Sequence, residues 1–290
     1  MQGPLGHIIG IGGVLGEVVS MNSKMVPPTV IEYLGRLADG DGQPLCMSQF
    51  QSLPAQPLAG RGATTILSLG ASMNAGKTTT AAQMIRSLTV AGHRVAAAKI
   101  TGTACLKDLN FLYDAGAVAV LDFTAAGWPS TANLSMEQLL SIAGRIRAAL
   151  QAHDPEFVII EIADGILQRE TAMLLENDSF RASVDGVTFA GPDALSCAGG
   201  VRRLRELGYP VLATAGIVAN GPLGIAEAEA ACDVRCLPGE TILAGGLVSL
   251  LRTVRARVIS SATPNGAAMS MAPVERETVP GTHGAGRAAL

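Results

Sequence analysis

The chain has 290 residues, of which 48% are hydrophobic, so it can bury at least one sizeable core. A net charge of −3 and an aromatic content of 3% argue against a basic, base-stacking surface for nucleic acids. The five cysteines lack Cys-x-x-Cys spacing, and the four-residue spacing of Cys232 and Cys236 is only a weak indication of a metal. We therefore expect idle or buried thiols in a protein of the reducing cytoplasm. Neither nucleic acid nor a membrane is an expected partner. We expect a small-molecule substrate as the partner, and a homodimer remains open.

Residues 1–62 differ from the rest of the chain because they are rich in glycine and proline. Short β-like pieces lie at residues 7–11 and 14–20, and a short helix is the interpretation of residues 29–37. The segment HIIGIGGVLGEVV is short, interrupted by glycines and carries Glu17, which is typical of neither a signal peptide nor a membrane span. We predict a small N-terminal β-rich module and a linker over residues 1–62.

The segment TTILSLGASMNAGKTTTAAQMI, residues 64–85, predicts a phosphate-binding loop. The loop pattern is Gly, four residues, Gly-Lys and then Ser or Thr, and Ala71 takes the first position here. An apolar strand precedes the loop, and an apolar helical face follows it, which is the context that this motif requires. Backbone N–H groups at a helix start bind anions, with the helix dipole behind them. The predicted nucleotide-binding residues are Asn74, Ala75, Gly76, Lys77, Thr78 and Thr79, with Lys77 on the β- and γ-phosphates and Thr78 on Mg²⁺.

Strands and helices alternate after this loop. We predict strands at 94–99, 117–123, 156–162, 186–190 and 210–216, and helices near 106–114, 134–151, 168–176, 194–207 and 241–251. Ser135 and Gln138 form a predicted capping box. Apolar strands that alternate with helices indicate an α/β fold with a doubly wound, mostly parallel sheet over residues 63–257. Residues 258–290 are small, polar and rich in Pro and Gly, which predicts a disordered tail.

Charged residues follow the strands at the edge where such folds bind ligands. Lys99 ends the second strand and is predicted to contact the substrate as a catalytic residue. Glu161 ends the fourth strand between two isoleucines, a position that is costly for a carboxylate without a cation or partner. Glu161 and Asp164 are therefore candidate Mg²⁺ ligands together with Thr78, and Lys77, Lys99 and Glu161 form the predicted catalytic set.

Four further features keep two interpretations each. Asp122 either faces the site or caps the next turn, and Trp128 either packs or contacts a ligand. Arg169 and Glu170 form either an ion pair or a substrate contact. Asn220 is predicted to bind the nucleotide base through its amide, with an Asn-Gly turn as the alternative.

The segments ASMNAGKTTTA, AAAKITGT and FVIIEIADG, in this order, resemble a group of P-loop proteins over about residues 64–250. This group includes dethiobiotin synthetase, the cobyrinic acid amidating synthases and the DUF1611-type proteins, and the chain is also similar to the relatives that hand over molybdopterin-guanine dinucleotide. In the first two families the second strand delivers a lysine towards the substrate, and the fourth strand ends in Glu-Gly-Ala-Gly. This chain has Glu161-Ile-Ala-Asp164-Gly165 there, and it lacks the extra loop lysine of MinD- and ParA-like ATPases.

The resemblance implies that ATP and Mg²⁺ are the cofactors and that a carboxylate or carbamate attacks the γ-phosphate. We therefore expect an ATP-dependent ligase or kinase that acts on a small carboxylated metabolite. Two other classes stay open: a nucleotide-gated carrier or chaperone in cofactor or metal biosynthesis, and a DUF1611-like N-acyltransferase that acts on an amino acid.

Overall fold

The computed structural model describes residues 5–10, 12–54 and 62–262, and its centre is a sheet of six parallel strands. The strands lie in the order β6-β5-β7-β4-β8-β9. Their bounds are β4 (Thr64–Gly70), β5 (Val95–Lys99), β6 (Val120–Asp122), β7 (Phe157–Glu161), β8 (Gly186–Ala190) and β9 (Val211–Ala215). The predicted α/β fold with a parallel sheet is thereby confirmed.

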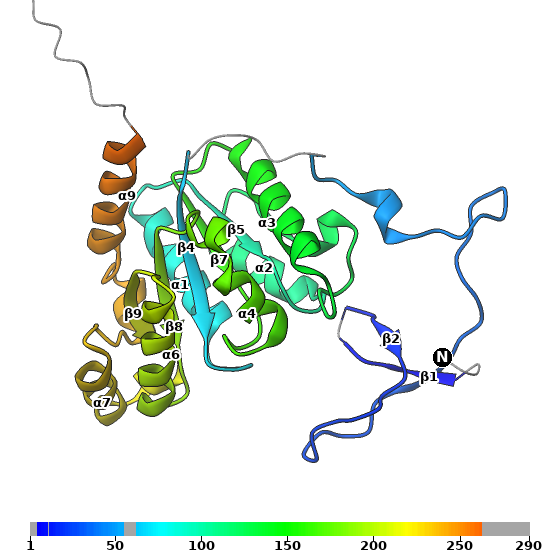
Figure 1. The fold of residues 1–290 in the computed structure, drawn as a ribbon, viewed down its shortest axis with the longest axis horizontal. Coiled ribbons are helices and arrows are strands. Elements are labelled where there is room, and N and C mark those ends of the chain that lie inside the picture. Colours follow the sequence, from blue (N-terminus) through cyan, green and yellow to red (C-terminus); the bar gives the residue numbers. More distant parts are fainter. Residues whose placement is uncertain (1–4, 11, 55–61, 263–290) are drawn as a thin grey trace, which may run out of the picture.

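Helices cover both faces of this sheet (Figure 1). One face packs against α1 (Lys77–Val90), α2 (Leu106–Asp114), α8 (Gly239–Leu243) and α9 (Val248–Ala262). The other packs against α3 (Met136–Gln151), α4 (Arg169–Glu176), α5 (Asp178–Arg181), α6 (Ala194–Glu206) and α7 (Pro222–Cys232). Strand pleating divides the core in two, because Ile66 of β4 belongs to the first cluster while Leu67 and Leu69 belong to the second.

The predicted capping box starts α3. The Ser135 hydroxyl accepts a hydrogen bond from the Gln138 backbone N–H at 3.3 Å, and the Gln138 side chain accepts one from the Ser135 N–H at 2.8 Å. Two of the free N–H groups at the helix start are satisfied in this way. The helix then buries one apolar face, whose members are Leu139, Ile142, Ala143, Ile146, Ala148 and Leu150.

The C-terminal helices differ from the prediction. The single helix expected near residues 241–251 is two helices, α8 and α9, because Gly245 between them has a left-handed φ of +90° that ends the first. Helix α9 then runs to Ala262, so residues 258–262, predicted to start a disordered tail, are helical. Val254 and Val258, four residues apart, are both 8% exposed, which explains why the helix continues. The rest of the predicted tail, 263–290, lies outside the described residues.

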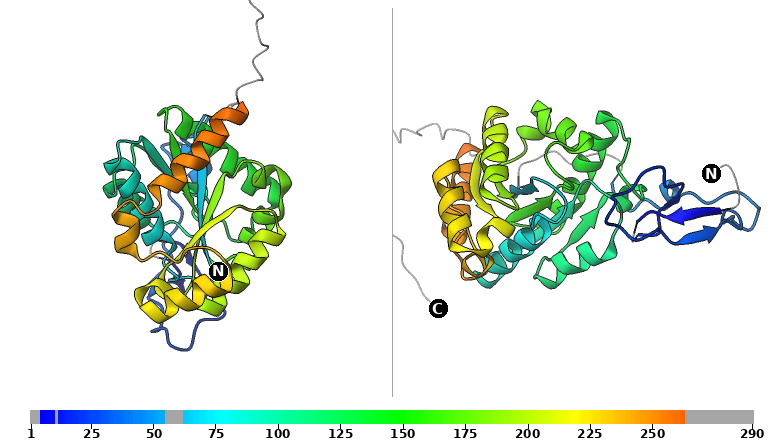
Figure 2. Two further views of the ribbon diagram at one scale, coloured as in Figure 1. Left: turned by 90° about the vertical axis from the view of Figure 1, so that its left-hand side faces the viewer. Right: turned by 90° about the horizontal axis from the view of Figure 1, so that it is seen from below.

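Residues 5–10 and 12–54 form an N-terminal arm that extends from one side of the α/β core (Figure 2). It contains a three-stranded antiparallel sheet in the order β2-β1-β3, made of β1 (Leu5–Ile8), β2 (Leu15–Gly16) and β3 (Val30–Glu32), and a 3₁₀ helix, η1 (Met47–Phe50). The helix predicted over 29–37 is therefore wrong. The β-branched Val30 and Ile31 follow Pro28 and pair with β1, where an extended backbone suits them.

The end of the arm is attached to the core by hydrogen bonds. The Ser52 N–H donates to the carbonyl of Ala125 at 3.0 Å, in the 3₁₀ helix η2 (Phe123–Ala126) that follows β6. The Arg145 guanidinium of α3 donates to the carbonyl of Pro54 at 2.8 Å. The arm therefore has a defined place beside the carboxyl end of the sheet. No helix in the described part of the chain is long and apolar enough to cross a membrane.

Candidate functional site

The predicted phosphate loop joins β4 to α1 in a conformation that only glycine allows at Gly76. This residue has φ of +108° and precedes the first helical residue, Lys77. A Cβ atom at Gly76 would also lie 2.8 Å from the Cα of Gly216. The Ser68 hydroxyl donates to the Lys77 carbonyl at 2.8 Å and so fixes the helix start against the strand. The N–H groups of the first helical turn have no partner within the helix, so this end is chemically suited to an anion.

Thr78 and Glu161 meet across the sheet, 83 residues apart in sequence. The Thr78 hydroxyl donates to Glu161 Oε1 at 2.8 Å. Glu161 is 2% exposed, and its other oxygen, Oε2, is buried without a hydrogen-bond partner in the described part of the chain. Burial raises the pKa of this carboxyl, and the charge of Lys99 and the Thr78 hydrogen bond offset that effect only in part. A buried carboxylate oxygen of this kind is unusual in a folded protein and indicates a functional position.

Lys77 is the buried cation of the loop. Its Nζ donates to the Ser72 carbonyl at 2.7 Å, and the residue is 5% exposed. Burial lowers the pKa of Lys77, and the negative charges of Glu161 and Asp164 oppose this only in part. An anion beside the ammonium group would supply the charge that water no longer provides.

Lys99 lies next to Glu161 because β5 and β7 are neighbours and these two residues are partners in the parallel register. Its ammonium group forms an ion pair with Asp108 of α2. Burial lowers the pKa of Lys99, but the charges of Glu161 and Asp108 outweigh it, so the pKa stands above its usual value. Lys99 is therefore charged at neutral pH, as a group that contacts an anion must be.

Asp164 lies in the loop that follows β7, and polar contacts hold that loop. The hydroxyls of Thr101 and Thr171 both donate to the carbonyl of Ala163, the residue before Asp164. Thr171 is fully buried, and Thr101 is 1% exposed. The loop that carries Asp164 is thus fixed from two sides, by the segment after β5 and by α4.

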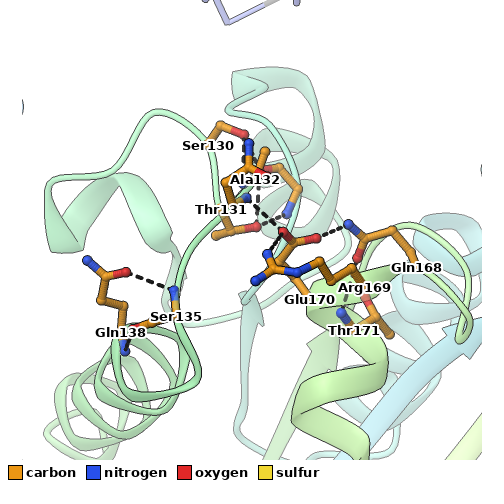
Figure 3. A network of polar contacts seen from close by, with 11 residues as sticks. Ser130, Thr131, Ala132, Ser135, Gln138, Gln168, Arg169, Glu170 and Thr171 are labelled. Carbon is orange, nitrogen blue, oxygen red and sulfur yellow. Dashed lines mark hydrogen bonds and ion pairs between the residues drawn. The ribbon is translucent and has the colours of Figure 1, made fainter.

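A second network, drawn in Figure 3, centres on the buried Glu170 of α4. Its carboxylate accepts hydrogen bonds from the Asn133 N–H at 2.7 Å and from the side chains of Gln168 and Arg169. Arg169 and Glu170 therefore form the ion pair that was one of the two predicted alternatives, with N and O 2.9 Å apart. The segment that holds Asn133 also fixes Gly102, whose N–H donates to the Thr131 hydroxyl at 2.8 Å.

Three pockets open around the loop. The first, of about 470 Å³ and here called the loop pocket, is lined by Asn74, Gly76, Lys77, Thr78, Thr79 and Asp108 among others. The second, of about 380 Å³ and here called the arm pocket, is lined among others by Lys77, Lys99, Glu161, Asp164, Ile9 and Gly10. The third, of about 190 Å³ and here called the side pocket, includes Gly76, Thr79, Gln83, Gly216, Asn220 and Gly239.

The structure thus brings the predicted residues to one edge of the sheet. Lys77, Thr78, Lys99, Glu161 and Asp164 all line the arm pocket. Asn220, at the end of the 3₁₀ helix η3 (Ile217–Asn220) after β9, lines the side pocket on the other side of the loop. Ala75 is buried within the loop, 1% exposed, so it contributes backbone only.

Two of the open alternatives are decided by contacts. Asp122 caps η2, because its carboxylate accepts a hydrogen bond from the Thr124 N–H at 2.9 Å. Trp128 packs against the core cluster beside α3. Cys232 and Cys236 are buried, and no group of three His, Cys, Asp or Glu residues in the described ranges is arranged to hold a metal ion.

Sequence reasoning missed Asp108, Gln83 and the arm residues. Asp108 lies in the first turn of α2 and meets Lys99 because that helix starts directly after the loop that follows β5. Gln83 is an ordinary polar position in the sequence of α1, and it lines the side pocket only because the chain around Gly239 lies next to it in the fold. The one available signal for the arm was its row of glycines, which permit a close backbone approach.

No protein-family model matches the chain, and no curated protein matches it either. Among solved structures, the chain is similar to a signal recognition particle 54 kDa protein from Aeropyrum pernix K1 in complex with GDP, with 20% identity, a TM-score of 0.43, and coverage of 74% of this chain and 55% of that one. A DUF1611 family protein from Anabaena variabilis has 13% identity and a TM-score of 0.44, with 71% and 63% covered. A ParA family ATPase from Chlorobium tepidum TLS has 13% identity and a TM-score of 0.40, with 69% and 99% covered.

The chain spans less than two thirds of the first two of these structures. All three TM-scores lie below 0.5, and we assign no activity from them. The resemblance to dethiobiotin synthetase and the cobyrinic acid synthases stays a prediction.

Proposed function

We propose that this protein binds a nucleoside triphosphate with Mg²⁺ and transfers its γ-phosphoryl group to a small carboxylated acceptor, as an ATP-dependent ligase or kinase does. The observation that carries this proposal is the contact of Thr78 with Glu161, 2.8 Å between their oxygens, beside the buried and unpartnered Glu161 Oε2. A hydroxyl from the loop and a carboxylate from the adjacent strand are the two protein groups that such enzymes use for Mg²⁺.

The residues present fit a magnesium ion. Mg²⁺ prefers hard oxygen ligands and takes few of them from the protein, the remainder coming from phosphate and water. Thr78 and Glu161 supply two oxygens, and Asp164 is the further candidate because it lines the same pocket. A bound Mg²⁺ would neutralise phosphate charge and orient the transferred group.

The chain's own groups account for the other steps. The N–H groups at the start of α1 and the Lys77 ammonium bind and orient the phosphates. Lys99 lies in the arm pocket beside Lys77 and is placed to attract an anionic acceptor. The acceptor oxygen attacks the γ-phosphorus, the bond from that phosphorus to the bridging oxygen breaks, and the nucleoside diphosphate leaves with that oxygen.

The base of the nucleotide is assigned to the side pocket. This pocket shares Gly76 and Thr79 with the loop pocket, and Asn220 of η3 and Gln83 of α1 also line it. Amides donate and accept hydrogen bonds, so they can bind the edge of a purine. ATP is the proposed nucleotide, and GTP is the alternative that the same amides accommodate.

Phosphate release from ATP by the purified protein tests the proposal. We expect release that requires Mg²⁺, stops with a chelator, and rises when small carboxylates are added. GTP in place of ATP tests the base. Absence of release with both nucleotides, combined with consumption of acetyl-CoA in the presence of amino acids, would favour the acyltransferase instead.

A further inference from the structure

The arm pocket has a wall that comes from outside the α/β core. Ile9 and Gly10 of the N-terminal arm line it together with Lys77, Lys99 and Glu161. The neighbouring core wall is the segment Gly102–Cys105, between β5 and α2. The pocket is therefore bounded by two parts of the chain that lie more than 60 residues apart in sequence.

The arm touches the core here through backbone, and glycines make the contact possible. A Cβ atom at Gly12 would lie 2.0 Å from the Ala104 carbonyl oxygen, and one at Gly10 would lie 2.8 Å from Thr103 Cγ2. Gly10 has no left-handed φ, so its backbone conformation does not itself require glycine. The contact with residues 103 and 104 is thus the obstacle to a side chain at either position.

Local hydrogen bonds fix the shape of this part of the arm. The Gly13 N–H donates to the Gly10 carbonyl at 3.0 Å, and the Ile9 N–H donates to the Val14 carbonyl at 2.8 Å. These bonds close a turn next to β1, which pairs with β2 on one side and with β3 on the other. The wall therefore continues directly from the central strand of the N-terminal sheet.

We propose that Ile9 and Gly10 form the outer wall of the acceptor pocket, here called the arm wall, that the close approach of Gly12 to Ala104 sets the position of this wall, and that the wall limits the size of the acceptor. The carboxylated class of the acceptor rests on the proposed function, because the pocket is lined by Asp108, Glu161 and Asp164 as well as by Lys77 and Lys99. The size limit rests on the wall itself and on a volume of about 380 Å³ that the acceptor shares with the transferred group.

Cys105 supplies a probe inside the pocket that needs no knowledge of the acceptor. Its side chain is half-buried and lines the arm pocket next to Ala104. Cys46 is exposed, and the other three cysteines are buried, so a Cys46→Ser background leaves Cys105 as the reactive thiol. Labelling by iodoacetamide, which is small, is compared with labelling by fluorescein maleimide, which is bulky, and mass spectrometry identifies the labelled residue.

The ratio of the bulky to the small labelling rate measures how far the wall excludes large molecules. Both reagents attack the same thiolate, so a change in the thiolate fraction cancels in the ratio. We expect Gly12→Ala to raise this ratio by about tenfold or more. A rise of this size follows if a state in which the arm has moved away from the pocket is populated at roughly 10% or less in the parent protein and becomes dominant in the variant. The matched control is Gly40→Ala on the same arm, where a Cβ atom meets nothing within 4 Å, and it should leave the ratio unchanged.

Gly10→Ala serves as a second variant. It should raise the ratio less than Gly12→Ala does, because the added Cβ atom would meet the Thr103 side chain, which can move, and not a backbone carbonyl. If Gly12→Ala does not fold, Gly10→Ala against Gly40→Ala decides. Unchanged ratios in the folded wall variants, or an equal rise in Gly40→Ala, would overturn the proposal. The labelling uses no nucleotide, so it tests the arm wall independently of the proposed function. If the labelling ratios change as expected but the protein shows no Mg²⁺-dependent phosphate release, the proposed function is refuted and the proposal about the arm wall is retained.

Discussion

The burial of the Glu161 side chain opposes the negative charge of its carboxylate. Its carboxylate is 2% exposed, and one of its oxygens has no hydrogen-bond partner in the described structure. A charge in such a place destabilises the free protein unless a cation joins it. The raised pKa of Glu161 expresses the same cost, because burial favours the neutral acid.

We predict that Glu161→Gln abolishes Mg²⁺-dependent turnover and raises the melting temperature of the free protein above pH 4.5. A raised carboxyl pKa means that the folded state binds the proton more tightly, so wild-type stability falls as the pH rises from 4.5 through the folded pKa. The variant lacks this loss. The advantage of the variant should therefore vanish below pH 4.5, and Mg²⁺ with ATP should stabilise the wild type more than the variant. Scanning fluorimetry across pH tests this, and full turnover in the variant would contradict the role of Glu161.

Lys99 should act on the acceptor more than on the nucleotide. We predict that Lys99→Met, which keeps much of the volume of the side chain, raises the acceptor KM or removes the stimulation of phosphate release by carboxylates. Nucleotide affinity should fall less than in Lys77→Ala, because Lys77 lies in the phosphate loop and Lys99 ends a neighbouring strand. Steady-state kinetics with titrated nucleotide separate the two effects. A larger loss of nucleotide affinity in Lys99→Met would assign Lys99 to the phosphates.

At the scale of elements, helix α9 packs one face against the sheet. Leu251 is fully buried in the cluster beneath it, whereas the adjacent Leu250 is 38% exposed. We predict that Leu251→Ala lowers the free energy of unfolding by about 2–5 kcal/mol. The matched control Leu250→Ala should cost about 1 kcal/mol or less. Urea denaturation measures both, and equal losses would show that the helix is not docked as described.

Elements with strong local signals could be predicted from the sequence. The start of α3 follows from its capping box, and the phosphate loop follows from its spacing between an apolar strand and a helix. Helix α7 was missed because Gly221 and Pro222 indicate a turn, although proline is also suited to the first helical position, which it takes here. The predicted helix of the arm failed because pairing with β1 decides the conformation of β3, and pairing cannot be seen in a local window.

The candidate site was predictable in part for the same reason. Lys77, Thr78, Lys99 and Glu161 follow strands, and topology alone brings them to one edge of the sheet. The ion pair of Lys99 with Asp108 and the wall from Ile9 and Gly10 depend on tertiary packing. Neither contact leaves a periodic pattern in the sequence.

At the scale of the whole molecule, thiol reactivity should report global unfolding. Burial raises the pKa of Cys197 to about 12, and burial also raises the pKa of Cys232 and of Cys236. At pH 8 roughly one Cys197 thiol in 10,000 is then ionised. We predict that only Cys46 and Cys105 are alkylated in the native protein and that the other three react after unfolding in urea. Rapid native labelling of Cys197 would show that the cover formed by α6 and α7 opens locally.

We propose that the loop after β4 binds the phosphates of a nucleotide. Calorimetric titration of Mg²⁺·ATP into the wild type and into Lys77→Ala tests this binding. The variant loses a charge-assisted contact worth about 1.5–3 kcal/mol, which corresponds to a Kd roughly tenfold to a hundredfold higher. We expect saturable binding in the wild type and this loss in a variant with an unchanged circular dichroism spectrum. Absence of binding in the wild type, or equal affinity in Lys77→Ala, would contradict it.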